Sequence, residues 1–244
     1  MQRLFRIKRG EINVIDLGAV IVAAGNGTRM GTAEKKQFLM VNGKPILAWT
    51  VDVFQAMPEV KQMVIVTAEA DRDRCESLGL ISGWNKVRAI VNGGLDRQTS
   101  VLAGVRALNN EWILVHDGVR PLVSEDAVRR CLQAAEKHGA AVLAVPVKDT
   151  IKKVDEQGFV IDTPDRSSLW AMHTPQVFRR DVLIAAIERA IAKGEVATDD
   201  AAAVERLGHR IYLVKDEETN LKITTPSDLD MAAFWLRKRE EDKQ

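Results

Sequence analysis

Apolar and polar positions along the chain follow two alternating patterns. Short runs of consecutive apolar, often β-branched residues are each followed by a turn and then by apolar residues spaced three or four apart. The runs predict buried strands and the spaced positions predict helices, because a strand that is covered on both faces has no polar side. This order indicates an α/β fold: a Rossmann-like, mostly parallel twisted sheet with helices on both faces.

The first part of the chain carries the clearest pattern. The strands are expected at Gly18–Ala23, Gln62–Thr67, Val87–Asn92, Trp112–His116 and Ala141–Val147. The helices are expected at about Pro45–Ala56, Asp71–Leu78, Asp96–Leu108 and Ser124–Lys137. The third helix has an apolar face, as a helix that lies on a sheet should. This face consists of Val101, Leu102, Val105 and Leu108.

The pattern changes after Val147. Residues 148–176 alternate polar and apolar positions around a turn at Glu156–Gly158, which predicts a protruding β-arm. A two-stranded arm is marginally stable by itself, so we expect a homodimer in which a second copy covers it. Beyond the arm, helices are expected at about Arg180–Ala192 and Asp199–Leu207, strands near Ile211–Val214 and Leu221–Ile223, and a last helix from Pro226.

Length and composition favour a small cytoplasmic protein with one domain. The chain has 244 residues, and we expect a flexible N-terminal extension over residues 1–16 followed by a single domain over residues 17–240. The net charge of +1 gives no overall attraction to nucleic acid or to an acidic membrane, and neither partner is expected. Cys75 and Cys131 lack metal or redox spacing, which is typical of a reduced compartment.

The segment VIVAAGNGTRMGTAEKKQFL joins the first predicted strand to the first helix. Gly25 and Gly27 begin a dinucleotide fingerprint, but Met30 occupies the position of its third glycine, and no G-K-[ST] of a P-loop follows. Arg29 and Lys36 add two cations beside backbone groups that small residues leave accessible. This combination favours a triphosphate site, and the alternative is a surface loop with solvated basic residues.

Four further groups of motifs fall where strands should end, at the edge at which open α/β sheets bind ligands. They are NGGLDRQTS, VHDGVRP, PVKDT, and ATDDA with NLKITTP. With the glycine loop, they closely resemble the 2-C-methyl-D-erythritol 4-phosphate cytidylyltransferases, members of the nucleotidyltransferase superfamily that serve the non-mevalonate isoprenoid pathway. The resemblance runs from about Leu17 to Leu236.

The resemblance implies a role for individual residues. The CTP-triphosphate loop would be formed by Ala23, Ala24, Gly25, Gly27, Arg29 and Lys36, and the cytosine and ribose segment by Gly93, Gly94, Arg97 and Ser100. Asp117 would lie at the Mg²⁺ and ribose site. The methylerythritol phosphate pocket would contain Arg166, Thr174, Thr198 and Lys222, with the arm arginine supplied by the opposite subunit. Arg29, Lys36 and Lys222 would be the catalytic cations, whereas Thr150 and Arg120 match motif positions of less definite role.

The sequence also departs from the family pattern. Lys35 stands before Lys36 where proline is usual, so either lysine could contact phosphate. Leu95 occupies a position where an acidic residue can contact the nucleotide, and His173 replaces a common glutamine.

The implied reaction transfers CMP from CTP to 2-C-methyl-D-erythritol 4-phosphate, with Mg²⁺ as cofactor and pyrophosphate as the leaving group. Two alternatives stay open at this point. An alditol-phosphate cytidylyltransferase, for example one that acts on ribitol 5-phosphate, would share several of the motifs. A non-catalytic sensor of CTP would share the nucleotide loop but would have no reason to keep cations on both sides of the α-phosphate.

Overall fold

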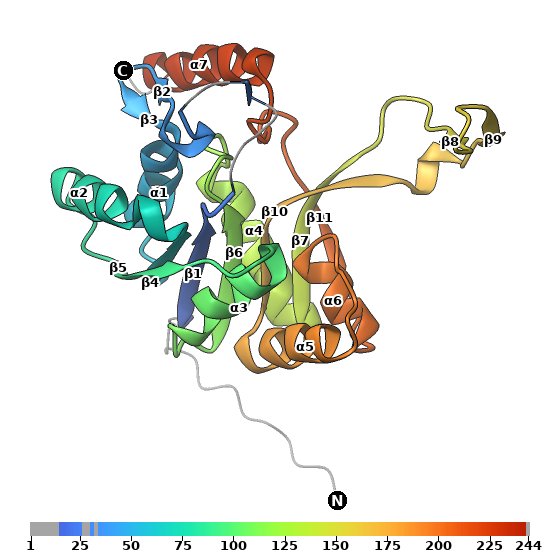
Figure 1. Cartoon of the computed structure of the whole chain (residues 1–244), viewed down its shortest axis with the longest axis horizontal. Helices are drawn as coiled ribbons and strands as arrows, with labels where there is room; N and C mark the ends of the chain where they lie inside the picture. Colours follow the sequence, from blue (N-terminus) through green and yellow to red (C-terminus); the bar gives the residue numbers. More distant parts are fainter. Residues whose placement is uncertain (1–14, 26–29, 32–33, 243–244) are drawn as a thin grey trace, which may run out of the picture.

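The computed structural model describes residues 15–25, 30–31 and 34–242. Most of the expected N-terminal extension lies outside these residues. Seven strands of the described part form a central sheet in the order β11-β7-β10-β6-β1-β4-β5 (Figure 1). They are β1 (Leu17–Val22), β4 (Val60–Thr67), β5 (Val87–Asn92), β6 (Trp112–Asp117), β7 (Ala140–Pro146), β10 (Trp170–Arg179) and β11 (Tyr212–Lys215).

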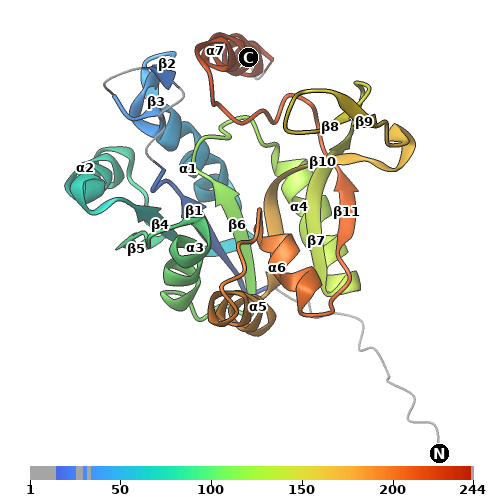
Figure 2. The same cartoon turned by 45° about the vertical axis from the view of Figure 1, so that its right-hand side comes forward.

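Helices cover both faces of the sheet, which confirms the expected fold class (Figure 2). One face packs against α1 (Ile46–Ala56), α2 (Arg72–Ser82) and α4 (Glu125–His138). The other packs against α3 (Arg97–Arg106), α5 (Arg180–Ala192) and α6 (Asp200–Arg206). Within β1, Ala19 and Ile21 face the first set of helices and Val20 faces the second, as the alternation of a strand requires. The predicted apolar face of α3 is buried.

A smaller layer covers the loop that follows β6. It consists of α7 (Pro226–Glu241) and the hairpin of β2 (Met40–Val41) with β3 (Lys44–Pro45). Their shared apolar cluster includes Val119 and Ile223, which flank the residues of the candidate site. The sequence predicted α7 but not the two-residue strands, which are too short for a periodic pattern.

The strand β10 corrects the expected extent of the arm. We expected residues 148–176 to leave the sheet, but β10 pairs antiparallel with β7 from Trp170 onward and with β6 from Gln176 onward. Pro175 argued against a central strand because proline cannot donate to the ladder. The pairing with β7 is irregular between Met172 and Gln176, which accommodates the proline.

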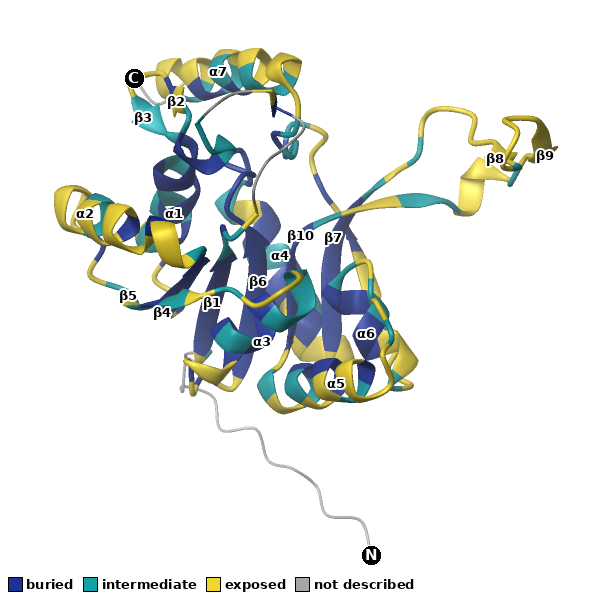
Figure 3. Ribbon diagram, viewed as in Figure 1, coloured by how far each residue is buried: buried dark blue, intermediate teal, exposed yellow. Residues whose placement is uncertain are grey.

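The part of the arm that does protrude is short. Strands β8 (Lys153–Val154) and β9 (Val160–Asp162) form a hairpin away from the body of the molecule (Figure 1). Its residues are exposed, in contrast to the buried central strands (Figure 3).

A further prediction was wrong, since Leu221–Ile223 is an irregular segment and not a strand. No helix among the described residues is long and apolar enough to cross a membrane.

Candidate active site

A cavity of about 310 Å³ opens where β1, β5 and β6 end. Such an edge is the usual ligand site of an open α/β sheet. Residues from five separate segments of the chain line the cavity. They are Val22, Ala23, Ala24, Gly25, Lys36, Gln37, Gly94, Leu95, Asp96, Arg97, Ser100, Asp117, Val119 and Lys222.

One wall is made of turns with small residues. A Cβ added to Gly93 would lie 2.7 Å from Ala24 Cβ, so the turn after β5 packs directly against the turn after β1. Ser100 Oγ accepts from Gly94 N at 3.0 Å and donates to Asp96 O at 2.7 Å. These contacts hold the turn against the first helical residues of α3, and they leave backbone groups near the cavity where an anion can approach.

The start of α3 is fixed by its own sequence. Asp96 is the N-cap and its carboxylate accepts from Thr99 N at 2.7 Å, while the Thr99 hydroxyl accepts from Asp96 N at 3.2 Å. This reciprocal cap satisfies N–H groups that a helix end leaves without a partner. Because the helix begins here, Arg97 and Ser100 lie in its first turn and face the cavity.

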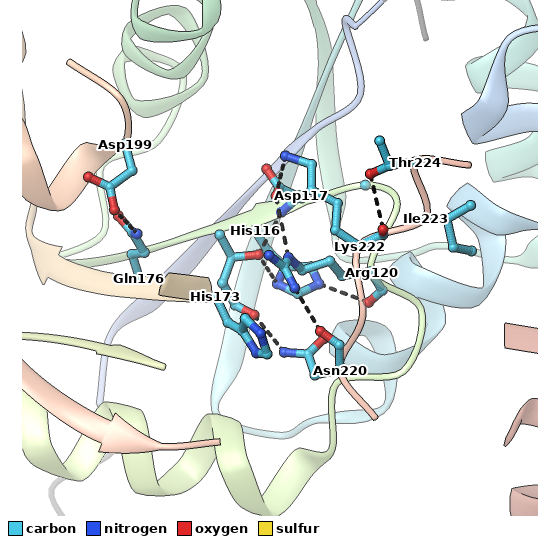
Figure 4. Close-up of polar contacts among 12 residues, drawn as sticks. His116, Asp117, Arg120, His173, Gln176, Asp199, Asn220, Lys222, Ile223 and Thr224 are labelled. Carbon is cyan, nitrogen blue, oxygen red and sulfur yellow. Dashed lines mark hydrogen bonds and ion pairs between the residues drawn. The ribbon is translucent and has the colours of Figure 1, made fainter. Parts of the chain in front are cut away.

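The opposite wall is charged and centres on Asp117 at the end of β6 (Figure 4). Asp117 Oδ2 lies 2.9 Å from Lys222 Nζ and 3.4 Å from Arg120 Nε. Its Oδ1 lies 3.8 Å from Arg97 Nη2. Burial by itself would raise the pKa of Asp117, but the three cations outweigh burial and hold that pKa well below its usual range. The carboxylate is therefore ionised at neutral pH.

Arg97 bridges the charged wall to α6. Its Nη2 donates to the buried Asp200 Oδ2 at 2.8 Å. Burial raises the pKa of Asp200, although the Arg97 guanidinium beside it acts in the opposite direction. For Arg97, burial would lower the pKa, but the carboxylates of Asp200 and Asp117 outweigh it and raise that pKa. Gln176 fixes the start of the same helix, since its amide donates to Asp199 Oδ2 at 2.8 Å and accepts from Ala201 N at 2.9 Å (Figure 4).

The two adjacent lysines of the glycine loop have different surroundings. Lys36 lines the cavity, and its Nζ donates to Ile223 O at 3.4 Å, beside Lys222. Lys35 Nζ lies 2.6 Å from Asp71 Oδ2 at the start of α2. This ion pair directs Lys35 to a different element, so of the two adjacent lysines Lys36 is the one that lines the cavity.

A buried hydrogen-bond network lies behind Asp117. His116 Nε2 is 3.1 Å from Arg120 O, and its Nδ1 is 3.0 Å from Thr174 Oγ1. Complete burial lowers the pKa of His116 to about 4, so the ring is neutral near pH 7. Since a carbonyl only accepts, Nε2 carries the proton and Nδ1 accepts from the Thr174 hydroxyl. That hydroxyl in turn accepts from Asp117 N at 3.1 Å.

The structure gathers most of the residues that the sequence singled out. Ala23, Ala24, Gly25, Lys36, Gly94, Arg97, Ser100, Asp117 and Lys222 all line the cavity. Gly93 and Thr174 lie behind it as packing and hydrogen-bonding residues. Thr198 is exposed just before α6. Arg166 lies beyond the cavity on the arm, where it donates to Lys148 O at 2.6 Å. Gly27 and Arg29 lie outside the described residues, and their roles stay predictions.

Three residues of the site had no assigned role, or only an indefinite one, in the sequence. Arg120 contacts Asp117, Asp200 holds Arg97, and the buried Asn220 contacts three separate segments of the chain. All three lie inside the motifs VHDGVRP, ATDDA and NLKITTP. The motifs therefore pointed to the right segments, but the partners of these side chains come from distant parts of the chain.

The comparisons with known proteins point to one family. The family profile of 2-C-methyl-D-erythritol 4-phosphate cytidylyltransferase matches residues 17–238. A protein of that name from Desulforamulus reducens is 46% identical over 224 residues, which are 91% of this chain and 96% of the relative. One from Caldanaerobacter subterraneus subsp. tengcongensis is 41% identical over 227 residues, 92% of this chain and 100% of the relative.

Solved structures agree as well. A 4-diphosphocytidyl-2C-methyl-D-erythritol synthase from Anaerococcus prevotii superposes with a TM-score of 0.81 at 31% identity, covering 93% of this chain and 98% of its own. A 2-C-methyl-D-erythritol 4-phosphate cytidylyltransferase from Thermus thermophilus gives a TM-score of 0.75 at 30% identity, covering 91% of this chain and 100% of its own.

Proposed function

The chain belongs to the family of 2-C-methyl-D-erythritol 4-phosphate cytidylyltransferases, and on that premise we propose which residues carry out its reaction. The enzyme transfers CMP from CTP to 2-C-methyl-D-erythritol 4-phosphate and releases pyrophosphate, in the non-mevalonate route to isoprenoid precursors. The observation that carries the assignment of residues is the cavity itself, where a wall of small-residue turns faces an ionised carboxylate surrounded by cations.

CTP would bind along the wall of turns. Residues 23–25 offer backbone groups to the triphosphate, and residues 93–100 offer backbone and hydroxyl groups to the cytosine and ribose. Lys36 and Lys222 both line the cavity, and Lys36 Nζ donates to the carbonyl of Ile223, the residue after Lys222. Their ammonium groups would flank the α-phosphate, with Arg29 as a further proposed cation.

The chemistry needs charge and positioning more than a base. A phosphate monoester is already anionic near neutral pH, so its oxygen attacks the α-phosphorus without losing a proton to the protein. The obstacle is repulsion between two polyanions and the charge that grows on the departing pyrophosphate. Fixed cations in a partly enclosed site lower that barrier, because they are oriented before the reaction begins.

Mg²⁺ is the proposed cofactor, with Asp117 as its protein ligand. No cluster of three or more His, Cys, Asp or Glu that could hold a metal occurs in the described part of the chain. A single carboxylate is nevertheless sufficient for Mg²⁺, which takes its other ligands from phosphates and water. Asp117 fits, because it is ionised and lines the cavity, and because its Oδ1 lies 3.8 Å from Arg97 Nη2, beyond hydrogen-bond distance. When bound, Mg²⁺ neutralises phosphate charge.

The acceptor phosphate would meet the charged wall, with Arg166 supplied by a second copy of the chain. The arm exposes the apolar side chains of Phe159, Val160 and Ile161 at 69%, 57% and 65% of their surface. Exposed apolar side chains gathered in a protruding hairpin are typical of an interaction site. A homodimer that covers the arm would bury this surface and bring Arg166 of one protomer toward the cavity of the other.

The test is pyrophosphate release from CTP and Mg²⁺ with either acceptor. We expect release with 2-C-methyl-D-erythritol 4-phosphate and little with ribitol 5-phosphate, and we expect it to stop when Mg²⁺ is chelated. Release only with ribitol 5-phosphate would favour the alditol-phosphate alternative. Absence of release with both acceptors would favour the alternative of a non-catalytic CTP sensor.

We also propose that the enzyme is cytoplasmic, which agrees with its two buried free cysteines.

A further inference from the structure

Lys222 occupies a key place in the cavity without a regular element to hold it. Residues 220–224 are neither helix nor strand, yet Lys222 Nζ lies 2.9 Å from Asp117 Oδ2. A lysine side chain has four rotatable bonds and loses much conformational freedom when it is held in one place. The backbone that carries it must therefore be fixed by contacts other than a ladder or a helical turn.

Asn220 supplies such contacts from two positions before the lysine. The residue is fully buried. Its Nδ2 donates to Thr174 O in β10 at 2.9 Å and to Asp216 Oδ2 at 2.7 Å. The backbone carbonyl of Asn220 accepts from Arg120 Nη1 at 2.7 Å (Figure 4). Among the described residues its Oδ1 has no hydrogen-bond partner, so the side chain works only as a donor.

The acceptors of this amide are themselves fixed. Asp216 N donates to Ala144 O in β7 at 2.8 Å, and Asp216 Oδ2 also contacts His173 Nδ1 at 2.7 Å. Thr174 lies between β6 and β7 in the sheet. Asn220 therefore ties the irregular segment to β10 directly and to β7 through Asp216. A carboxylate of the same shape would face two acceptors and find no donor.

The hydrogen bonds form a closed ring that returns to Asp117. The Thr174 hydroxyl accepts from Asp117 N at 3.1 Å, and Arg120 Nε lies 3.4 Å from Asp117 Oδ2. On the other side of Lys222, Ile223 N donates to Val119 O at 3.0 Å. The lysine is thus held between two anchored residues, and both anchors lead to the loop that follows Asp117.

We propose that Asn220 is the positioning residue of Lys222: it fixes the segment so that the ammonium group faces the α-phosphate site beside Asp117. Asn220 does not line the cavity and acts through the lysine. The proposal rests on the proposed function, in which Lys222 acts on phosphate. It also makes β10, the strand that continues from the arm, part of the support for the catalytic cation.

A double-mutant cycle of Asn220→Ala and Lys222→Ala tests this role. Displacement of a catalytic group by about 1 Å costs on the order of 10²-fold in rate, so we expect Asn220→Ala alone to lower kcat roughly 10- to 100-fold. The KM for CTP should change less than about threefold, because the nucleotide wall is elsewhere. In the Lys222→Ala background, Asn220→Ala should cause no further loss of kcat. An equal fold loss in both backgrounds would overturn the proposal.

Asn110 provides the matched control. It is also a buried asparagine, and its Nδ2 donates to Asp16 Oδ1 at 2.6 Å just before β6 begins, at the opposite end of that strand from Asp117. Asn110→Ala should lower the melting temperature but leave kcat unchanged. If Asn110→Ala lowers kcat as much as Asn220→Ala does, the effect is one of general stability and the proposal fails.

A second variant keeps the test decisive if Asn220→Ala does not fold. Asn220→Ser stays polar but is too short to reach both acceptors, and it enters the same cycle if the alanine variant is unfolded by circular dichroism. Failure of both variants to fold would assign Asn220 to the fold and overturn the proposal. Failure of this proposal can be told apart from failure of the proposed function, because in the second case the wild-type enzyme itself would release no pyrophosphate.

Discussion

The two walls of the cavity are built in different ways. The nucleotide wall consists of turns after β1 and β5, in which small residues and a helix cap act within a few positions of one another. The charged wall joins Asp117, Arg97, Arg120 and Lys222, which come from three segments and are held by buried hydrogen bonds. The first wall can be recognised in local sequence, whereas the second depends on how strands pair across the sheet.

The largest expected effect tests the lysine that joins the two walls. Lys36→Ala should lower kcat by about 10²- to 10³-fold, the usual cost of removing a group that stabilises charge in the transition state. Lys35→Ala is the matched control, because Lys35 pairs with Asp71 outside the cavity, and it should retain kcat within about threefold. Steady-state pyrophosphate release measures both. Near-native turnover of Lys36→Ala would show that another cation makes the contact.

Asp117→Asn probes the centre of the charged wall. The change leaves three cations around a neutral amide, and breaking a buried charged pair typically costs about 3–5 kcal/mol; since Lys222 is partly exposed, we expect about 2 kcal/mol. Activity should fall on the order of 10²-fold with loss of the proposed metal ligand. Urea unfolding and turnover at several Mg²⁺ concentrations test these effects. Unchanged stability would contradict the ionised, cation-bound carboxylate.

Mixing two inactive variants tests whether the charged wall is shared between subunits. An Arg166→Ala chain mixed with a Lys36→Ala chain should form heterodimers with one intact site, and random exchange predicts about a quarter of wild-type activity. Activity is assayed after the mixture has equilibrated, with each variant alone as the control. If no activity returns although exchange is demonstrated, Arg166 does not act across the dimer.

The smallest expected effects distinguish packing from ligand contact in the nucleotide wall. A Cβ at Gly25 would meet no atom of the described residues within 4 Å, so Gly25→Ala should leave the melting temperature unchanged but raise the KM for CTP several-fold if the phosphates approach this backbone. Gly93→Ala would press on Ala24 and should cost about 1–3 kcal/mol by overpacking. Equal KM values for wild type and Gly25→Ala would remove this backbone from the proposed phosphate site.

The sequence by itself determined the elements whose signals are local. Runs of buried strand residues and the apolar face of α3 gave the layers of the fold, and the missing third glycine at Met30 excluded a dinucleotide loop. Five motifs in order then identified the segments that meet at the cavity. These features are readable because their physical causes, strand alternation, helix period and turn chemistry, involve neighbours in the chain.

Only the tertiary structure decided which side chains act together. It inserted β10 between β6 and β7 despite Pro175, turned Lys35 toward Asp71 and left Lys36 at the cavity. It also placed Asn220 beside Thr174, which is 46 positions away in the sequence, and beside Arg120, which is 100 positions away. Such choices depend on strand pairing and on the need to satisfy buried polar groups, and neither leaves a periodic trace in the sequence.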